Sequence, residues 1–504
     1  MFVFRNQRKG VLARPLCIWQ EKYGNIFNLR LLWENRYWTC EPEHIKCILA
    51  TEFDKHEKGS VFRSVVSTVL GTGVFSADDE LWKFHRSMTR PFFVRARISD
   101  FDVFDRHAQD AIRLLKSRAR EGYAVDLQDL FSRFTLDSAT EFLFGYDVRS
   151  LSESLPYPHS ASPTPYASSS SRTSFSSASD FSTAFSAAQS IMFERNPLGT
   201  WWPLREFWED KTRKHMRVIE GVIDPILARA LAREKARRAE IGAGAEKADT
   251  KNSGALEVAE GETLLEYLVK VTDDPVILKD EMINIMVAGR DTTATLLTFA
   301  SYMFSEHPDV LKRLREEVVR TVGDRRPTYD DIRNMKYMRA VLNETLRLFP
   351  PVPLNLRKCK TDVLWPSKRA DGRPYYVPAG TTTPYSVWHL HRLEYLWGPD
   401  AHVFDPDRFL DERVHRLSRN PFMFLPFNAG PRICLGQQFA YNEASFMLVR
   451  LLQTFSSVEL DMAAVPPGKI PPVFDDMKRN EKVWIKSHLT SYVDGGLWVK
   501  LGEA

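Results

Sequence analysis

The sequence lacks the patterns that identify several large classes of protein. Its five cysteines are odd in number and form no CxxC or CxxCH pair, which argues against a disulfide framework, a zinc ribbon and a CxxCH attachment site. No apolar run reaches the roughly 18 residues that a bilayer requires, so the sequence as given contains no segment expected to cross a membrane. The 69 basic and 65 acidic residues nearly balance, which argues against a nucleic-acid-binding protein. We find no GxGxxG nucleotide-binding unit and no internal repeat.

The composition is that of a globular enzyme. Apolar residues make up 43% of the 504 positions, aromatic residues 12% and charged residues 27%, which excludes a fibrous or wholly disordered chain. A chain of this length can enclose a deep cofactor pocket, and large enzymes with a single core reach this size. We therefore expect one domain over residues 1–504. Cysteines without a disulfide pattern fit a reducing compartment.

Hydrophobic periodicity predicts a mainly α fold with small β-sheets. A strand pair is expected at Phe27–Trp38, where apolar residues alternate, with its turn at Glu34 and Asn35. Helical spacing dominates from Leu81 onward. The predicted helices are Phe101–Arg120, Leu127–Phe144, Arg205–Arg238, Pro275–Ser305, Pro308–Val322, Tyr337–Phe349 and Gln437–Phe455.

Two segments interrupt the helical pattern. Residues 151–187 are dominated by serine, and their weak apolar content would not offset the entropy lost on ordering them. This segment is predicted to be a disordered surface insertion. Residues 241–261 are rich in Ala, Gly, Glu and Lys without periodicity, which predicts a flexible linker between two long helices.

The strongest local pattern surrounds one cysteine. The stretch Phe427-Asn-Ala-Gly-Pro-Arg-Ile-Cys-Leu-Gly436 runs directly into an amphipathic helix that begins near Gln437. A thiolate near a helix N-terminus is stabilised by free backbone N–H groups and by the helix dipole. Gly430 and Gly436 would let the backbone turn and approach a flat ligand closely. Taken alone, Cys434 could also be a structural cysteine buried in a turn.

This pattern matches the Phe-x-x-Gly-x-Arg-x-Cys-x-Gly signature of the cytochromes P-450, and the sequence is identified as a member of that family. The resemblance implies the cytochrome P-450 fold, in which haem b lies between a long oxygen-activating helix and the helix after the cysteine loop. Cys434 would then be the axial ligand of the haem iron, and its thiolate would favour cleavage of the O–O bond. The other four cysteines have no expected role.

A second motif, Met282–Ala294, interrupts the apolar face of the longest predicted helix. Gly289 in a helix interior costs about 0.5 to 1 kcal/mol relative to alanine, and adjacent threonine hydroxyls tend to bend the helix by bonding back to its carbonyls. Read alone, the segment could be a helix-packing glycine with surface polar residues. In the family it resembles the oxygen-activation groove, where Ala288 and Gly289 make room for dioxygen. Asp291 and Thr292 would then deliver protons.

The pattern Trp82-x-x-x-Arg86 puts an indole N–H and a guanidinium on one helical face. A single Trp–Arg pair is more often a surface stack. The resemblance implies that both side chains bind a haem propionate, together with Arg357 and with Arg432 in the cysteine loop. Phe427, at the start of that loop, is also expected to bind the cofactor.

A Glu–Arg pair at Glu344-Thr-Leu-Arg347 contributes only a few tenths of a kcal/mol on a solvated helix, so it carries little information alone. Downstream, Phe404-Asp-Pro-Asp-Arg-Phe409 resembles the second half of a buried Glu–Arg–Arg network of the family. The resemblance places Arg408 against Glu344 and Arg347. These three residues would fix the cysteine loop and take no part in the reaction.

The implied activity is a monooxygenase that inserts one atom of dioxygen into an apolar substrate by hydroxylation or epoxidation, with electrons from NADPH through a separate reductase. Asp137–Gly145 and Asn343–Pro350 resemble the fungal microsomal subgroup that oxidises alkanes and fatty acids. That resemblance implies the cytosolic face of the endoplasmic reticulum membrane, although the subgroup's N-terminal anchor is absent from this sequence. The aromatic patch Trp201–Trp208 resembles the family's membrane-dipping loop, or it caps the substrate pocket.

Three alternatives remain open. A haem-thiolate isomerase or dehydratase of the same fold would need neither dioxygen nor a reductase, but the Asp291–Thr292 pair argues against it. A non-enzymatic haem-binding protein could use His389, His391 or His402 as its ligand, although no motif surrounds these histidines. A zinc or thiol enzyme at the loop cysteine would lack the neighbouring ligands or base that it needs.

Overall fold

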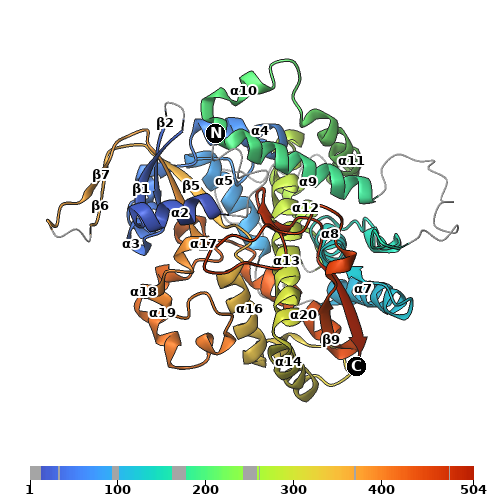
Figure 1. Ribbon diagram of the computed structural model, residues 1–504. Coiled ribbons are helices and arrows are strands. Elements are labelled where there is room, and N and C mark those ends of the chain that lie inside the picture. Colours follow the sequence, from blue (N-terminus) through green and yellow to red (C-terminus); the bar gives the residue numbers. More distant parts are fainter. Residues whose placement is uncertain are drawn as a thin grey trace.

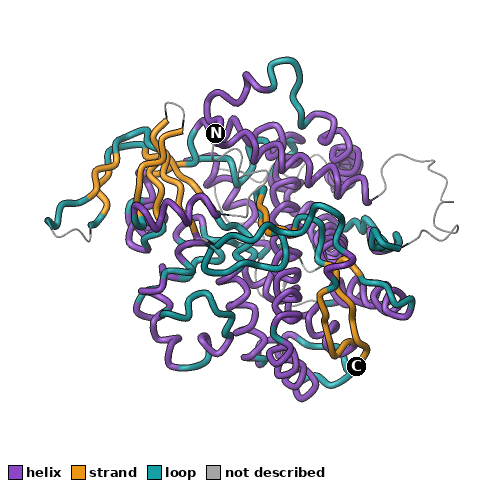
Figure 2. Tube along the Cα trace, in the orientation of Figure 1, coloured by secondary structure: helices purple, strands orange, loops and turns teal. Residues whose placement is uncertain are grey.

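The computed structural model describes residues 13–31, 34–93, 101–161, 178–241, 258–259, 261–367, 371–475 and 477–504. Helices form most of the molecule, and most strands lie together at one side of it (Figures 1 and 2). Helix α13 (Pro275–Glu306) runs through the centre, with other helices packed around it (Figure 1). The architecture confirms the predicted fold class, mainly α with small β-sheets.

The other helices are α2 (Arg14–Tyr23), α3 (Pro42–Lys46), α4 (Ser60–Leu70), α5 (Asp79–Thr89), α7 (Asp102–Arg120), α8 (Leu127–Phe144), α9 (Ala178–Arg195), α10 (Trp202–Arg205), α11 (Arg213–Ile241), α12 (Leu264–Val271), α14 (Pro308–Thr321), α15 (Tyr329–Asn334), α16 (Lys336–Leu348), α17 (Val387–Leu390), α18 (Glu394–Trp397), α19 (His415–Arg419) and α20 (Gln437–Thr454). The strands are β1 (Ile26–Leu31), β2 (Glu34–Thr39), β3 (His56–Glu57), β4 (Val125–Asp126), β5 (Leu354–Cys359), β6 (Val363–Trp365), β7 (Tyr375–Val377), β8 (Thr382–Ser386), β9 (Phe455–Leu460), β10 (Ile485–Ser487), β11 (Ser491–Val493) and β12 (Trp498–Glu503).

A five-stranded sheet joins three N-terminal strands to β5 and β8, in the order β1-β2-β8-β5-β3. β1 and β2 are antiparallel, and β2 pairs in parallel with β8. The remaining strands form a three-stranded sheet, β4-β12-β9, and the pairs β6-β7 and β10-β11. The predicted strand pair near the N-terminus is confirmed. Its predicted turn is wrong, because Glu34 and Asn35 already pair with Leu31 and Arg30 as part of β2.

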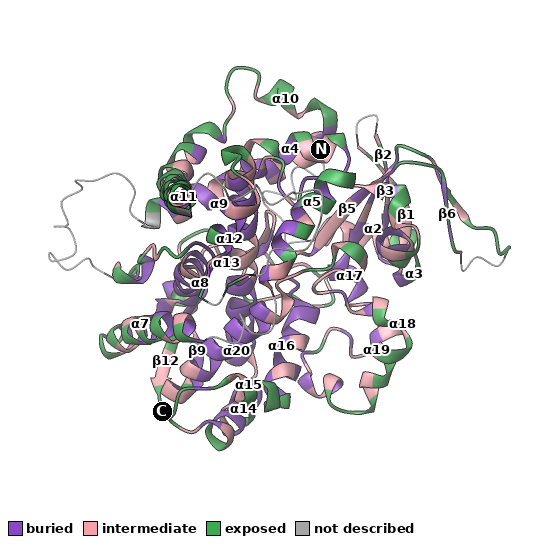
Figure 3. Cartoon of the chain, turned by 180° about the vertical axis from the view of Figure 1, so that it is seen from behind, coloured by how far each residue is buried: buried purple, intermediate pink, exposed green. Residues whose placement is uncertain are grey.

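Most of the central helix α13 is buried. It begins after Asp274, whose side chain accepts two backbone hydrogen bonds, and Pro275 occupies its first turn. From residue 281 to residue 304 every residue is buried except Ala288, Gly289, Asp291 and Thr292, which are partly exposed. Figure 3 shows that α16 and α20 beside it are also largely buried, whereas α10 lies at the surface. The partly exposed residues in this buried stretch of the helix therefore all lie within the predicted motif.

The predicted helices agree with the observed ones to within one residue at each end, apart from Arg205–Arg238. There, residues 206–212 separate α10 from α11. Within this break, Asp210 accepts hydrogen bonds from the backbone N–H and the hydroxyl of Thr212 at 2.8 and 2.7 Å. Arg195 of α9 pairs with Asp210 at 2.7 Å. These local side-chain bonds replace the helical ones, so the single predicted helix is wrong at this point.

The Ser-rich segment 151–187 differs from its prediction at both ends. At the N-terminal end, residues 151–161 are described, and Leu151 and Leu155 are buried. At the C-terminal end, residues 178–187 belong to α9, where Phe181 and Phe185 are fully buried and stack at 5.7 Å between ring centroids. Burial of these two rings stabilises the helix despite the polar composition around them. Disorder is therefore the wrong prediction for both ends, and residues 162–177 lie outside the described residues.

The predicted linker 241–261 lies largely outside the described residues, which include only residues 241, 258, 259 and 261 of it. It stays a prediction. Among the described helices, none combines the length and the apolar character needed to cross a membrane.

A buried ion pair on α16 anchors the region around the cysteine loop. Nε and Nη2 of Arg347 donate to the two carboxylate oxygens of Glu344, each at 2.7 Å, and neither side chain is exposed. Nε of Arg408 lies 3.5 Å from Glu344 Oε1. Nη1 of Arg347 also donates to the carbonyl oxygens of His391 and Ala401, at 2.8 and 2.6 Å. The geometry matches the predicted Glu–Arg–Arg network.

His391 connects the Glu344–Arg347 pair to the segment just before the cysteine loop. Its Nδ1 lies 3.1 Å from the carbonyl oxygen of Arg347, and its Nε2 accepts the N–H of Leu425 at 2.9 Å. Because Nε2 is an acceptor, the ring proton is on Nδ1 and is donated to Arg347. Burial and the charge of Arg347 lower the pKa of His391 to about 3, so the ring stays neutral. Leu425 lies two residues before Phe427, where the loop begins.

We expect Arg347→Lys to lower the free energy of unfolding by about 3 to 5 kcal/mol, because lysine keeps the charge but cannot make the paired bonds to Glu344. Arg313→Lys is the matched control. Arg313 also binds a carboxylate, Asp407, through two hydrogen bonds, but the two side chains are 50% and 44% exposed, so a loss of about 0 to 1 kcal/mol is expected. Urea unfolding followed by circular dichroism measures both, and equal midpoints would contradict the anchoring role.

Candidate haem-thiolate site

The loop that carries Cys434 is closed by backbone hydrogen bonds. The N–H of Cys434 donates to the carbonyl oxygen of Phe427 at 3.0 Å, and the N–H of Ile433 donates to that of Gly430 at 3.0 Å. The N–H of Gly436 is a hydrogen-bonding neighbour of the cysteine sulfur. Helix α20 follows directly, as the sequence predicts. The sulfur therefore lies where backbone donors stabilise a thiolate.

The two glycines of the loop have different roles. Gly430 has a φ of +69°, and a Cβ there would lie 1.8 Å from the carbonyl oxygen of Leu49, so no other residue fits. Gly436 has a φ of −87°, and its Cβ would lie 3.8 Å from the nearest atom, which belongs to Phe93. The expected need for glycine is confirmed at position 430. Within the protein alone, position 436 has room for alanine.

Cys434 differs from the buried cysteines in its exposure. Burial raises the pKa of the Cys434 thiol, while the N–H of Gly436 and the charge of Arg86 act in the opposite direction. Yet the Cys434 side chain is exposed, whereas Cys40 and Cys359 are buried. The sulfur is therefore accessible to a ligand, although the surrounding protein partly removes it from water. Metal coordination would overcome the raised pKa, because a coordinating thiol loses its proton outright.

Helix α5 places Trp82 and Arg86 beside the cysteine loop. Trp82 is buried and Arg86 is partly exposed. The guanidinium of Arg432, from the loop, lies 4.6 Å from the centroid of the Trp82 ring. Burial lowers the pKa of Arg86, and its strongest charged neighbour is Cys434. The predicted helical face therefore points at the loop.

Further cations gather at the same place. Arg357 on β5 is buried, and its Nη1 donates to the carbonyl oxygen of Leu356 at 2.8 Å. Burial, followed by the charge of Arg357, lowers the pKa of Arg432 to about 10. Burial, then Arg357 and Arg432, lower the pKa of Lys58 well below its usual range. The sequence motifs did not single out Lys58.

This cluster of cations fits a group that carries two carboxylates. Buried like charges are costly unless anions pair with them. Among the described residues, Arg432 forms an ion pair with the carboxylate of Asp78 at 3.0 Å. Two propionates would supply the remaining negative charge, and the Cys434 sulfur would supply an iron ligand. The residues present therefore fit haem b.

Asp291 of the α13 motif is held by side chains of α9 and α13. Its Oδ2 accepts a hydrogen bond from Nε2 of Gln189 at 2.6 Å, and its Oδ1 accepts one from Nη1 of Arg290 at 2.9 Å. Nη2 of Arg290 also donates to the hydroxyl of Ser182. Gln189 and Ser182 both lie on α9, and Ser182 belongs to the part of this helix that was predicted to be disordered. The side chain of Asp291 thus has two fixed donors.

Thr292 makes the expected hydrogen bond back to its own helix, whereas Gly289 also has a packing role. The Thr292 hydroxyl donates back to the carbonyl oxygen of Ala288 at 2.6 Å. A Cβ on Gly289 would lie 3.4 Å from Cβ of Ala139 on α8. Gly289 therefore also serves helix packing, the alternative considered from the sequence, while Ala288 and Thr292 stay partly exposed.

Two of the three histidines considered as alternative iron ligands, His389 and His391, are already engaged. Both ring nitrogens of His391 have the partners described above. His389 is buried, with Nδ1 2.7 Å from the Ser386 hydroxyl and Nε2 3.3 Å from the sulfur of Cys17. Burial lowers the pKa of His389 to about 3. These contacts disfavour a histidine-ligated haem at either residue.

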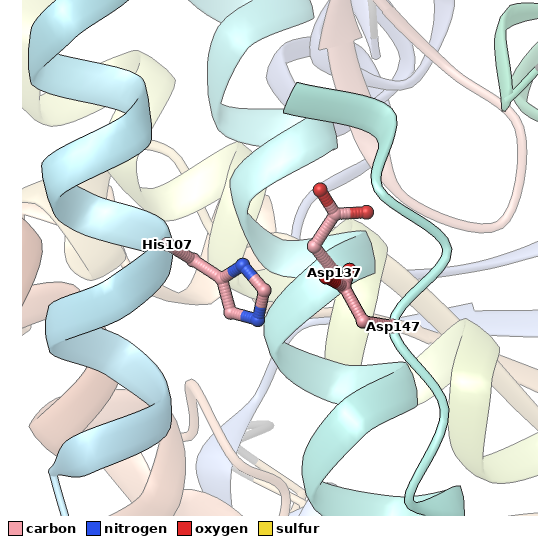
Figure 4. A group of neighbouring side chains, drawn as sticks. All are labelled: His107, Asp137 and Asp147. Carbon is pink, nitrogen blue, oxygen red and sulfur yellow. The ribbon is translucent and has the colours of Figure 1, made fainter. Parts of the chain in front are cut away.

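One group among the described residues has the composition of a metal site. His107 of α7, Asp137 of α8 and Asp147 of the following loop turn toward one another (Figure 4), with ligand atoms within 4.8 Å. However, Asp137 accepts the backbone N–H groups of Ser150 and Leu151, each at 2.9 Å, and His107 pairs with Glu141 at 2.7 Å. These bonds fix the loop after α8, which explains why the three side chains lie together.

Comparisons with known proteins point to one family. Residues 4–474 match the family model described as Cytochrome P450. The chain is 35% identical over 464 residues to "Cytochrome P450 monooxygenase himC" of Aspergillus japonicus, covering 91% of this chain and 76% of the relative. It is 35% identical to "Cytochrome P450 52A3-A" of Candida maltosa (89% and 80% covered) and 37% identical to "Cytochrome P450 52-M1" of Starmerella bombicola (89% and 82% covered).

The chain belongs to the cytochrome P450 family. It is a haem-thiolate monooxygenase, as the cysteine signature predicted. The family model spans both the α5 motif and the cysteine loop.

We expect Cys434→Ser to abolish the red-shifted Soret band of the reduced carbon-monoxide complex, because that band reports a thiolate ligand. Cys40→Ala and Cys359→Ala should keep the band, since both side chains are buried away from open space. The measurement is the reduced carbon-monoxide difference spectrum of the purified proteins. An unchanged band in Cys434→Ser would refute the ligand assignment.

Gly430→Ala should reduce the recovery of haem-loaded protein by about tenfold or more, because its Cβ would overlap the Leu49 carbonyl and its φ lies in the left-handed region. Gly436→Ala is the matched control and should retain haem to a larger extent. The ratio of Soret absorbance to total protein measures the loss. Equal ratios would show that the close approach to Leu49 does not constrain the loop.

Proposed function

We propose that this monooxygenase hydroxylates or epoxidises an apolar small molecule, with fatty acids and alkanes as the favoured class. The observation that carries the oxygenase chemistry is the partly exposed Asp291–Thr292 pair on the largely buried α13. The substrate class rests on Asp137–Gly145 and Asn343–Pro350, which resemble the alkane- and fatty-acid-oxidising subgroup. Similarity to the yeast relatives is consistent with that choice.

We assign haem binding to residues on three segments. The thiolate of Cys434 would bind the haem iron and is the metal-binding residue of this proposal. Trp82, Arg86, Arg357 and Arg432 hold the propionates by donating N–H groups to them. Phe427 contributes through its carbonyl oxygen, which fixes the backbone of Cys434, and through its ring, which packs against Tyr441 at 5.2 Å. Bound haem supplies oxygen activation, and the electron-rich thiolate favours O–O cleavage.

Asp291 and Thr292 are assigned to proton delivery. Gln189 and Arg290 hold the carboxylate of Asp291 from two sides, so its oxygens keep a fixed position. The Thr292 hydroxyl is bonded to Ala288 and has to rotate away before it can donate a proton into the open side of the helix. A positioned proton donor of this kind contributes about 10²- to 10⁴-fold to a reaction rate.

The electrons come from a separate NADPH-dependent reductase in this proposal, because the sequence contains no GxGxxG unit of its own. Family members generally use such a partner. The proposed location is the cytosolic face of the endoplasmic reticulum membrane, by resemblance to the microsomal subgroup.

Product analysis tests the substrate class. The haem-loaded protein is incubated with reductase, NADPH and, in separate reactions, a fatty acid, an alkane or an aromatic hydrocarbon. An alcohol or epoxide from the aliphatic substrates, dependent on NADPH, supports the proposal. Conversion of a hydroperoxide without NADPH or reductase, with no oxygenated product from any hydrocarbon, would favour the isomerase or dehydratase alternative.

We expect Thr292→Ala to leave the haem spectrum intact and to divert NADPH into hydrogen peroxide. Oxygen would still take up two electrons from NADPH and two protons from solvent, while the positioned proton that favours O–O cleavage is lost. Asp291→Asn should slow turnover by about 10²- to 10⁴-fold. The control is Thr298→Ala in the same helix, where a buried hydroxyl makes an equivalent bond to Ala294 at 2.7 Å. Product formed per NADPH is the measurement, and a wild-type ratio in Thr292→Ala would disprove its role.

The aromatic patch Trp201–Trp208 divides into two parts. Leu204, Phe207 and Trp208 are 67%, 73% and 93% exposed at the surface near α10. Trp202 is held instead, with Nε1 donating to the Ser64 hydroxyl at 2.8 Å and Arg195 over its ring at 4.2 Å. We propose that the exposed part contacts a membrane surface, since aromatic rings are favoured at bilayer interfaces.

Phe207→Ser combined with Trp208→Ser should weaken liposome co-sedimentation by about tenfold or more, because each removes a large apolar side chain from the interface. Val319→Ser is the control, since Val319 is 48% exposed on α14, at the opposite end of the molecule (Figure 1). Both variants should keep the haem spectrum. If the unaltered protein stays in the supernatant at low and moderate salt, the patch does not bind membranes.

A further inference from the structure

Asp78 is a buried carboxylate at the meeting point of several segments of the haem site. Its side chain is 6% exposed. Its oxygens accept the backbone N–H groups of Lys58 at 2.7 Å and Gly59 at 3.0 Å. Nη1 of Arg63 and Nη2 of Arg432 also donate to it, the latter at 3.0 Å. None of the sequence motifs includes Asp78.

These partners come from parts of the chain that are far apart in sequence. Lys58 and Gly59 follow β3, Arg63 belongs to α4, and Arg432 belongs to the cysteine loop. Asp78 itself lies directly before α5, which carries Trp82 and Arg86. One carboxylate therefore ties the propionate helix to the loop of the iron ligand.

The contacts of Arg432 give Asp78 a specific role. Nη2 of Arg432 donates to the carbonyl oxygen of Ala77 at 2.9 Å and to Oδ1 of Asp78 at 3.0 Å. The guanidinium also lies against the ring of Trp82. In the part of the chain that the structure describes, Arg432 uses Nη2 for these bonds, which leaves its Nε and Nη1 hydrogens for a propionate.

We propose that Asp78 is a positioning residue for haem: it holds Arg432 so that the remaining guanidinium donors face the propionates, an inference that rests on the haem assignment above. If Asp78 acted only as a counter-charge, its removal would have the opposite effect on haem binding. Removing an anion from a cluster of cations would then strengthen the attraction for the propionates, whereas removing a positioning contact weakens their binding. The two roles predict opposite changes in haem retention.

The experiment measures haem transfer from the ferric holoenzyme to apomyoglobin. Asp78→Asn removes the charge, and Asp78→Glu keeps it but moves the carboxylate outward by one methylene. We expect both to lose haem about tenfold faster or more, since truncating a buried charge pair typically raises the dissociation rate by at least this factor. Asp79→Asn is the control, because Asp79 is a neighbouring carboxylate, 65% exposed, that pairs with Lys360 instead.

A double-mutant cycle then asks whether Asp78 acts through Arg432. Arg432→Lys should itself speed haem loss, and adding Asp78→Asn should produce no further increase. Resonance Raman bands of propionate bending should shift in both single variants and remain unchanged in Asp79→Asn. These shifts would not follow from a general weakening of the fold.

Three outcomes would overturn the proposal. They are slower haem loss in Asp78→Asn, wild-type retention in Asp78→Glu, and effects that multiply in the cycle. If both variants at position 78 fail to fold, Asp78 belongs to the fold and the positioning role is wrong. The reduced carbon-monoxide spectrum of the unaltered protein is recorded first, because absence of the thiolate band there would refute the haem assignment itself.

Discussion

The buried ion pair between Glu344 and Arg347 is the contact on which the geometry of the haem-thiolate site depends. Two charges in a core are stable only if their hydrogen-bonding groups are satisfied. Arg347 meets this condition, because its five N–H groups serve the Glu344 carboxylate and three carbonyl oxygens, those of His391, Ala401 and Val403. His391 then bonds to Leu425, so the position of the Cys434 loop follows from that of α16.

Much of the site could be predicted from the sequence, because its chemistry is encoded locally. Ten consecutive residues define the loop of Cys434, and the close approach to Leu49 explains why Gly430 is part of that pattern. The motif in α13 likewise matches the partly exposed residues of that helix. The residues of each motif are near one another in sequence or on one helical face, so the pattern is visible even where, as at Gly430, the contact that requires it is with a distant residue.

Residues that act through distant partners could not be predicted in this way. Asp78 and Arg432 are separated by 354 positions, and Gln189 and Asp291 by 102. No periodicity or spacing connects them, since the fold alone brings them together. At α9 the composition led to a wrong prediction of disorder, because two buried rings, Phe181 and Phe185, determine the structure of this serine-rich segment. At residues 206–212, tertiary contacts of Arg195 with Glu206 and Asp210 replace the helix that periodicity favours.

The cation cluster around Arg357 also bears on how much of the enzyme a cell contains. Without an anionic ligand, Lys58, Arg357 and Arg432 repel one another in a poorly solvated place. A ligand that binds only the folded chain raises the folded fraction by mass action, and here it also removes this repulsion. Chains that have not bound haem are therefore unfolded more often and are more open to proteolysis than haem-loaded chains. The abundance of the enzyme would follow the supply of haem as well as the level of its messenger RNA.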